Sequence, residues 1–324
     1  MAHMNRILAP VLALLMIAGC PRFKEKDGNT STTGLTSIVC DNSFENILQQ
    51  EIDVYEYCYP KASVIPYYVS EAAALDSLLN IKTNLAVLTR ELTPDQVKYL
   101  KSKNKVARSK RIAVDAIALI INPENGCDIL SKKEISEILD GTVTDWNQLS
   151  PSKLGKIQVL FDNQGSSTVA YMRDSLLNGK EFGENVYAQG SNQAVFEGVK
   201  KHPNAIGILG VSWITSDLSS QIRSTEVRVK ASQASDTTNI SFSSDVKVVK
   251  VRADSSIHAY KPYQAYIFSG EYPLYRSIYM VCLSVPGTTA HGFFSFVTGV
   301  QGQKLIQMTG ILPATVRPRM VAVN

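Results

Sequence analysis

The stretch Phe161-Asp162-Asn163-Gln164-Gly165-Ser166-Ser167-Thr168-Val169-Ala170-Tyr171-Met172-Arg173 places a hydroxyl-rich turn between two apolar segments. The run from 157 to 161 predicts a buried strand, and the spacing of Val169, Met172 and Leu176 predicts a helix that ends at Gly179. A helix N-terminus leaves backbone N–H groups free where the macrodipole is positive. Three adjacent hydroxyls add donors, so the turn suits a small oxyanion, although a lone Ser166 or Ser167 is more typical of a helix cap.

Two further stretches repeat this order of strand, polar turn and helix. Residues 36–40 precede the turn Asp41–Ser43, and residues 85–88 precede Thr89–Glu91, after which Thr93 and Pro94 are typical of a helix start. Alternating strands and helices predict an α/β fold with largely parallel sheets. Because the carboxyl ends of parallel strands share one edge of a sheet, the three turns are expected to face one ligand site.

The remaining periodicity predicts further strands and helices. The apolar runs 112–121 and 275–283 predict long strands, and Ser131 with Glu134 forms a capping box for a helix that ends near Asp140. Additional strands are expected over residues 63–69, 205–210 and 246–251, and additional helices over 44–55, 75–79, 193–201, 292–298 and 303–308. Residues 212–245 give no clear pattern.

The N-terminal residues are typical of an export signal. Met1–His3 resembles a cloning remnant, and a positive residue with a short apolar run then leads to Ile17-Ala18-Gly19-Cys20, which is similar to a bacterial lipobox. We therefore expect residues 1–19 to be removed and Cys20 to carry lipid, with residues 20–35 as a flexible tether. An ordinary signal peptide with an incidental cysteine is the alternative. The predicted location is the bacterial cell envelope, either in the periplasm or on the cell surface.

Composition indicates an ordinary globular protein. Of the 324 residues, 44% are hydrophobic and 19% charged, and the net charge is +4. Residues 98–111 contain seven Lys or Arg, which we interpret as a solvated helix end and turn rather than a nucleic-acid site. Four cysteines remain besides Cys20; their spacing matches no zinc or redox motif and leaves disulfides and buried thiols equally open. They are Cys40, Cys58, Cys127 and Cys282.

Enzymatic chemistry is not indicated by these motifs. A serine-hydrolase elbow built on Ser166 or Ser167 would need glycine at position 169, where Val169 stands. The chain has no HxxxH or CxxC motif and no acidic cluster, so neither a metal nor a cofactor is expected. Trp146 and Trp213 are more typical of core or turn residues than of a sugar-binding platform. A binding protein is therefore the prediction.

The chain resembles the phosphate-binding component of bacterial ABC phosphate importers, in the type II periplasmic-binding-protein group. The resemblance covers nearly all of the chain after the tether and rests on an ordered set of stretches, none of them specific alone. They are residues 39–44, 85–92, 115–122, 141–147, 164–168, 205–208, 272–279, and 302–304 with 310–313.

The resemblance implies a two-lobe fold in which each lobe is a mainly parallel sheet flanked by helices. Two crossovers near residues 112 and 275 would divide the chain into lobe 1 (36–112 with 275–324) and lobe 2 (113–274). It further implies a monomer that closes over inorganic phosphate and delivers it to a membrane permease. The alternatives are a generic oxyanion binder, for example of sulfate, or a lobe pair repurposed for sensing or adhesion.

The resemblance also implies a set of site residues, with two departures from the family. Family members usually have an Asp after the strand at 85–88, where this chain has Thr89-Arg90, and many have an Arg just before the Gly/Ser/Thr loop. Arg90 could therefore anchor the ion through its planar fork, with Glu91 or Asp162 as a substitute proton acceptor. The expected phosphate ligands are Asn42, Ser43, Phe44, Thr89, Arg90, Gln164, Gly165, Ser166, Ser167 and Thr168.

Overall fold

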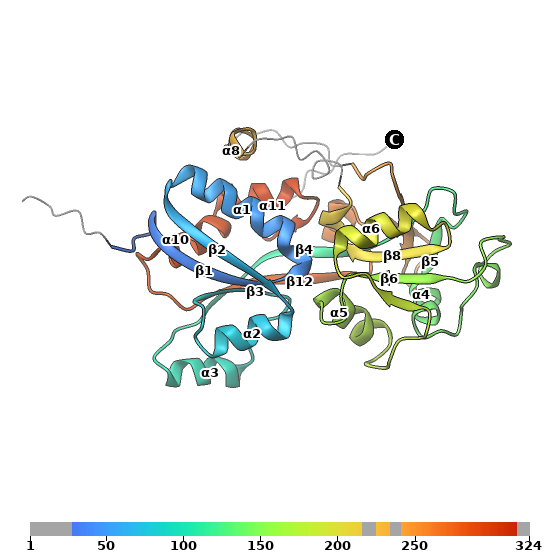
Figure 1. The fold of residues 1–324 in the computed structure, drawn as a ribbon, viewed down its shortest axis with the longest axis horizontal. Helices are drawn as coiled ribbons and strands as arrows, with labels where there is room; N and C mark the ends of the chain where they lie inside the picture. The colour runs from blue at the N-terminus through green and yellow to red at the C-terminus, as the bar shows by residue number, and fades with distance from the viewer. Residues whose placement is uncertain (1–27, 216–224, 234–240, 316–324) are drawn as a thin grey trace, which may run out of the picture.

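A computed structural model describes residues 28–215, 225–233 and 241–315. The described chain forms two lobes side by side, each a layer of strands with helices on both faces (Figure 1). A single path of hydrogen-bonded strands runs through both lobes, in the order β2 (Lys61–Val69), β1 (Thr33–Asp41), β3 (Leu85–Leu88), β12 (Tyr275–Cys282), β4 (Arg108–Ile121), β8 (Ala205–Gly210), β6 (Gln158–Phe161) and β7 (Val186–Ala188). The α/β two-lobe fold expected from the sequence is thus confirmed, but the sheet is mixed rather than mainly parallel, because β12 and β4 run antiparallel to the strands they pair with.

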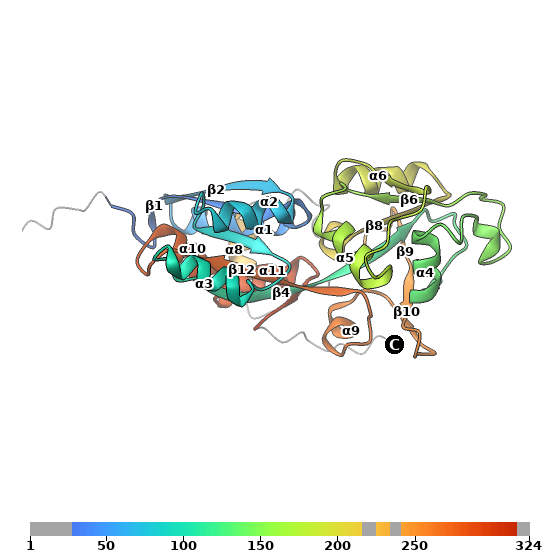
Figure 2. The same ribbon diagram turned by 90° about the horizontal axis from the view of Figure 1, so that it is seen from below.

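Lobe 1 contains the first half of the chain's sheet. Its strands are β1 (Thr33–Asp41), β2 (Lys61–Val69), β3 (Leu85–Leu88), β12 (Tyr275–Cys282), β13 (Leu312–Pro313) and the beginning of β4 (Arg108–Ile121). Its helices are η1 (Asn42–Phe44), α1 (Glu45–Cys58), α2 (Glu71–Leu79), α3 (Pro94–Ser102), α10 (Thr289–Val297) and α11 (Val300–Met308). Helices α1, α10 and α11 cover one face of the sheet, and α2 and α3 cover the other (Figures 1 and 2).

Lobe 2 follows the same plan. The end of β4 pairs with β8 (Ala205–Gly210) and β9 (Lys247–Val248). On its other side β8 pairs with β6 (Gln158–Phe161), and β6 pairs with β7 (Val186–Ala188). A second small sheet contains β5 (Ile129–Ser131), β10 (Lys250–Arg252) and β11 (Ala259–Tyr260). The helices are α4 (Lys132–Leu139), η2 (Trp146–Gln148), α5 (Ser167–Leu176), α6 (Asn192–Lys201), η3 (Val211–Trp213) and α9 (Gln264–Phe268).

Strands β4 and β12 connect the lobes. The first residues of β4 pair with β12 in lobe 1, and Ile117 to Ile121 pair with β8 in lobe 2. The crossovers expected near residues 112 and 275 fall in these two strands. In the part of the chain that the structure describes, no helix is both long and apolar enough to cross a bilayer.

Three details of the sequence interpretation differ from the structure. Strand β1 begins at Thr33, inside the expected tether, because its first residues are only partly buried and pair with β2 through the backbone, which requires no apolar pattern. The expected strand 246–251 is two strands in different sheets, since Val249 N–H bonds Leu119 while Lys250 N–H bonds Asp128. Helix α8 (Thr225–Gln233) occupies part of the unpatterned region, of which 216–224 and 234–240 lie outside the described residues.

The cysteine question is also answered for the four cysteines after residue 28. Cys40, Cys58, Cys127 and Cys282 are all free thiols, and Cys40 and Cys282 are buried in β1 and β12. Each therefore behaves as a small hydrophobic residue in its strand or loop. Burial raises the pKa of the Cys40 and Cys282 thiols, which keeps them protonated and unreactive at neutral pH.

Candidate functional site

The first polar turn lies at the carboxyl end of β1. The Asp41 side chain is fully buried and accepts a hydrogen bond from the backbone N–H of Ser43 at 2.9 Å, which starts the short helix η1. Asp is a favoured cap because its carboxylate satisfies an N–H that the helix cannot. The cap holds Ser43, a residue that is 1% exposed, at the boundary with lobe 2.

The hydroxyl-rich turn of lobe 2 meets this first turn directly. Ser166 caps α5, accepting from the Val169 N–H and donating to Asp162 at 2.6 Å. Ser167, the first residue of α5, donates its N–H to one Asp41 oxygen at 3.2 Å and its hydroxyl to the other at 2.7 Å. The hydroxyls of Thr168 and Ser43 lie 3.2 Å apart. Residues more than 120 positions apart thus share one buried cluster.

The cluster contains one cation, and it comes from the strand β12. The Arg276 side chain is 3% exposed and donates Nη1–H to the Ser167 hydroxyl at 2.7 Å. Its Nε and Nη2 donate to one oxygen of Asp115, on β4, at 3.2 and 3.1 Å. The guanidinium carbon also lies 4.7 Å from the centroid of the Phe44 ring, a cation–π contact. The two lobe-connecting strands therefore place a fixed arginine beside the N-terminus of α5.

Carboxylates outnumber cations in this cluster. Asp41, Asp115 and Asp162 are all fully buried, against the single guanidinium of Arg276. Burial raises the pKa of Asp115, an effect that the nearby Arg276 opposes, and burial likewise raises the pKa of Asp162. One oxygen of Asp115 and one of Asp162 accept no hydrogen bond from any described residue. The site therefore offers spare hydrogen-bond acceptors beside its donors.

The structure brings together some of the residues expected from the sequence and separates others. Ser43, Ser167 and Thr168 are in contact with one another. Ser166 bonds Asp162 next to them, and the Phe44 ring packs against the Arg276 guanidinium. The backbone N–H and the hydroxyl of Thr89 instead donate hydrogen bonds to the Glu71 carboxylate, at 2.7 and 2.6 Å. Asn42 is half-buried at the start of η1; Arg90, Glu91, Gln164 and Gly165 are exposed.

Arg276, Asp115 and Asp41 were not identified as site residues from the sequence. A signal for two of them was present, because Asp115 and Arg276 interrupt two otherwise apolar strands with opposite charges. The antiparallel register pairs these positions directly, which the separate strands could not reveal. A charge inside a buried strand is rare unless it is paired, so opposite charges in two buried strands indicate an ion pair between them.

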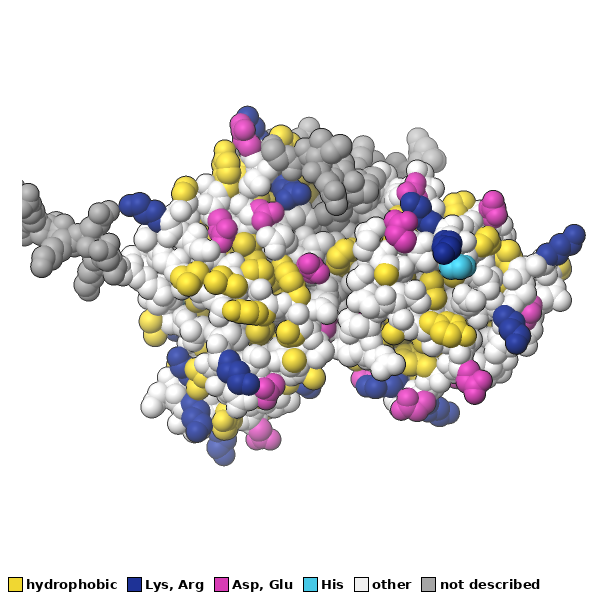
Figure 3. Space-filling view, viewed as in Figure 1, with side chains coloured by type: hydrophobic (Ala, Val, Ile, Leu, Met, Phe, Trp, Pro, Cys, Tyr) yellow, Lys and Arg dark blue, Asp and Glu magenta, His cyan; other side chains and the backbone are white. Residues whose placement is uncertain are grey.

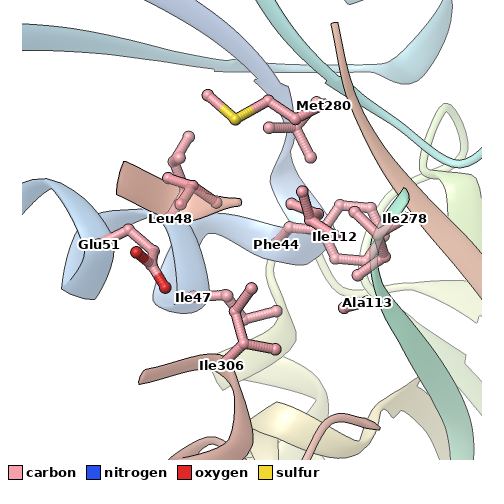
Figure 4. A pocket seen from close by; sticks show the side chains of 11 residues that line it. Phe44, Ile47, Leu48, Glu51, Ile112, Ala113, Ile278, Met280 and Ile306 are labelled. Carbon is pink, nitrogen blue, oxygen red and sulfur yellow. The ribbon is translucent and has the colours of Figure 1, made fainter. Parts of the chain in front are cut away.

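A separate cavity lies behind Phe44 in the core of lobe 1 (Figure 4). It has a volume of about 20 Å³, which is enough for about one water molecule. Its walls are apolar apart from Glu51, a residue of α1 that is 1% exposed. Since it offers no hydrogen-bond donor from Arg, Lys or a hydroxyl, it does not suit an oxyanion.

Comparison with known proteins places the chain in a family. A family model described as a PBP superfamily domain matches residues 27–300, so the chain belongs to this superfamily. The phosphate-binding protein PstS of Pseudomonas aeruginosa is 20% identical to it over 97% of this chain and 94% of its own length. These relatives confirm the resemblance found in the sequence, and the chain is a binding protein rather than an enzyme.

Solved structures agree on the fold. A Clostridium perfringens protein described as a phosphate ABC transporter substrate-binding protein with bound phosphate is 17% identical, with a TM-score of 0.66 over 87% of this chain and all of that one. An ABC-type phosphate transport receptor from Vibrio cholerae is 18% identical, with a TM-score of 0.62 over 86% of this chain and all of that one. At these identities the match establishes the shared two-lobe architecture.

Proposed function

We propose that this protein binds inorganic phosphate between its two lobes, at the cluster formed by Ser43, Ser167, Thr168 and Arg276. The observation that carries the proposal is the contact between the helix starts of η1 and α5, with the Arg276 guanidinium directed at the same point. Backbone N–H groups, hydroxyls and a planar cation are the donors that oxyanion sites use. The names of the relatives support phosphate as the ion.

The surplus of carboxylates favours a protonated oxyanion. Phosphate at neutral pH carries at least one hydroxyl, which can donate to a carboxylate, whereas sulfate carries none. Asp41 accepts hydrogen bonds from donors that the ion would use, so a bound ion would lie beside the Asp41 carboxylate. The two negative charges would repel each other. A ligand hydroxyl turns that repulsion into a hydrogen bond, so we assign Asp41 the acceptor role that the sequence left open between Glu91 and Asp162.

Two arginines compete for the role of anchor. Arg90, the residue expected from the sequence, is exposed after β3, whereas Arg276 is buried within the cluster. A buried guanidinium is desolvated and held by Asp115, so its hydrogen bond to an anion is not weakened by competing water. We therefore propose Arg276 as the main cationic ligand, with Arg90 limited to long-range attraction of the ion.

The test is isothermal calorimetry of the purified protein with phosphate and then sulfate. Arg276→Lys keeps the charge but loses the fork, and phosphate affinity should fall about tenfold to hundredfold, the range for a hydrogen bond to a charged group. Arg90→Ala is the matched comparison and should retain affinity within about threefold at physiological salt. The reverse ranking would return the anchor role to Arg90, and wild-type protein that binds neither ion would refute the proposal.

Folding controls keep this test interpretable. Loss of Arg276 leaves Asp115 as an unpaired buried charge, which is strongly destabilising. The paired variant Arg276→Gln/Asp115→Asn removes both charges together and should fold, as judged by thermal unfolding without phosphate. It too should lose phosphate affinity, because no cation then faces Ser167.

We further propose that the protein is exported, lipid-anchored through Cys20, and delivers phosphate to an ABC importer. The lipobox-like sequence and the names of the relatives support this. Labelling of cells with an alkyne fatty acid should modify the wild-type protein, and Cys20→Ala should abolish the label. Labelling that survives this substitution would contradict the anchor.

A further inference from the structure

A basic surface on lobe 1 lies outside the cluster between the lobes. It consists of the end of α3, the following loop and the first residues of β4, and we call it the basic patch. Its members are Lys98, Lys101, Lys103, Lys105, Lys110 and Arg111. Figure 3 shows Lys and Arg side chains gathered in the region of α3. No Asp or Glu occurs from residue 96 to 114.

The cations of the basic patch differ from other lysines in their surroundings. Lys133, Lys230 and Lys247 each pair with a carboxylate within 4 Å. Among the described residues, no member of the basic patch has a carboxylate partner. Their charge is therefore not neutralised locally, and the patch presents a positive field to whatever faces it.

Apolar side chains stand among these cations. Val97, Tyr99 and Val106 are 42%, 44% and 64% exposed. Lys103 also lies over the Tyr99 ring, with its ammonium 5.6 Å from the centroid. Cations interleaved with an aromatic and short aliphatic residues match the interface of an anionic bilayer, where headgroups meet the acyl chains.

One member of the basic patch, Lys110, lies near the point at which the N-terminal segment leaves the lobe. Asn29 accepts hydrogen bonds from the backbone and hydroxyl of Thr289, at the start of α10. Lys110 lies over the ring of Phe294 on the same helix, 6.0 Å from its centroid. Five helical residues span about 7.5 Å. The nine residues from Cys20 to Asn29 reach at most about 32 Å, so a lipid on Cys20 would keep lobe 1 near the bilayer.

We propose that the basic patch docks lobe 1 onto anionic phospholipid headgroups. Docking would fix the orientation of the body relative to the membrane and leave lobe 2 as the part that moves on closure. The proposal goes beyond phosphate binding, and it draws on the proposed anchor only for the position of the tether.

The test is co-sedimentation of the full chain with vesicles of equal parts phosphatidylglycerol and phosphatidylcholine at low salt. The variant Lys98→Gln/Lys101→Gln/Lys103→Gln should bind at least about tenfold more weakly than wild type, since each cation contributes separately. The matched control Lys153→Gln/Lys156→Gln/Lys180→Gln removes the same charge from exposed positions of lobe 2 and should bind like wild type. All chains share one N-terminus, so the comparison does not depend on lipid at Cys20.

Further variants and conditions separate the effect of charge from an effect on the structure. The variant Lys98→Arg/Lys101→Arg/Lys103→Arg keeps the charge and should bind like wild type, and high salt should remove the difference between the two glutamine variants. All variants should keep wild-type phosphate affinity, so a failure here leaves the phosphate proposal untouched. Equal binding of the two glutamine variants would overturn the inference. So would a difference that persists on pure phosphatidylcholine, or tighter binding of a short RNA than of the vesicles at equal phosphate concentration.

Discussion

Asp41 joins the two lobes through its carboxylate, which accepts hydrogen bonds from Ser43 and Ser167. Replacement by Asn keeps an oxygen to cap η1, so the fold should persist. The amide, however, presents N–H donors on one side and cannot accept a hydrogen bond from the ligand hydroxyl there. Asp41→Asn should therefore weaken phosphate binding and strengthen sulfate binding, and the ratio of the two affinities should fall about tenfold or more.

Calorimetry with both ions measures that ratio. The control is Asp145→Asn, because Asp145 caps η2 in the same manner but outside this cluster. The control should preserve the ratio. An Asp41→Asn protein with unchanged selectivity would exclude Asp41 as the acceptor and leave Asp162, whose second oxygen accepts no bond from a described residue.

Glu51 predicts a pH dependence of stability. Neither of its oxygens has a hydrogen-bond partner among the described residues, and burial raises its pKa well above the usual value. The folded state then keeps a proton that the unfolded chain loses at about pH 4.3. This contribution to stability is complete below that pH and declines as pH rises toward the raised folded-state pKa. Glu51→Gln stays neutral, so its stability should not decline in this way.

Thermal unfolding from about pH 5 to pH 8 tests this, since the range lies above the unfolded pKa of Glu. The melting temperature of wild type should fall relative to that of Glu51→Gln as pH rises. Glu45→Gln, an exposed change on the same helix, should follow wild type. Parallel curves for wild type and Glu51→Gln would show that Glu51 has the same pKa in both states.

At the scale of elements, local signals predicted most helices and strands correctly. The helix cap at Thr93 and the capping box at Ser131 are present as expected, and Pro66 lies in the edge strand β2. Such signals depend on residues three or four positions apart, so they can be recognised in a single sequence. The site is different, because Arg276 and Asp115 acquire meaning only through a β pairing between positions 161 residues apart. The hydroxyl turn could therefore be predicted, but its cation could not.

Strand β8 shows how tightly lobe 2 packs. A Cβ added to Gly207 would lie 2.7 Å from Val199 Cγ2 on α6 and 2.9 Å from Ile120 Cγ1 on β4. Gly207→Ala should thus destabilise the protein by about 1–3 kcal/mol, the usual range for overpacking. Gly126→Ala is the control, because no atom lies within 4 Å of the added methyl group, and it should change stability by less than about 0.5 kcal/mol. Chemical unfolding of the two variants measures this difference in stability. Equal unfolding midpoints for the two variants would mean that β8 and α6 can separate without cost.

At the scale of the whole molecule, the two lobes also touch outside the cluster of Ser43, Ser167 and Arg276. Asn46 on α1 donates to the Ser212 carbonyl at 3.0 Å, and the indole Nε1–H of Trp213 donates to the Ser43 carbonyl at 2.9 Å. Both bonds join helix starts of lobe 1 to η3 of lobe 2. They can form only when the lobes are together, so they contribute to closure and, through closure, to ligand affinity.

Trp213→Phe tests this coupling, because it removes the donor and keeps an aromatic ring. A neutral hydrogen bond contributes about 0.5–1.5 kcal/mol, so phosphate affinity should fall about twofold to tenfold. The control is Trp146→Phe, whose indole donates to the Asn204 carbonyl within lobe 2. That variant should unfold at a lower temperature yet bind phosphate like wild type. If Trp213→Phe also binds like wild type in calorimetry, closure depends on the cluster of Ser43, Ser167 and Arg276 alone, and the outer contacts only follow it.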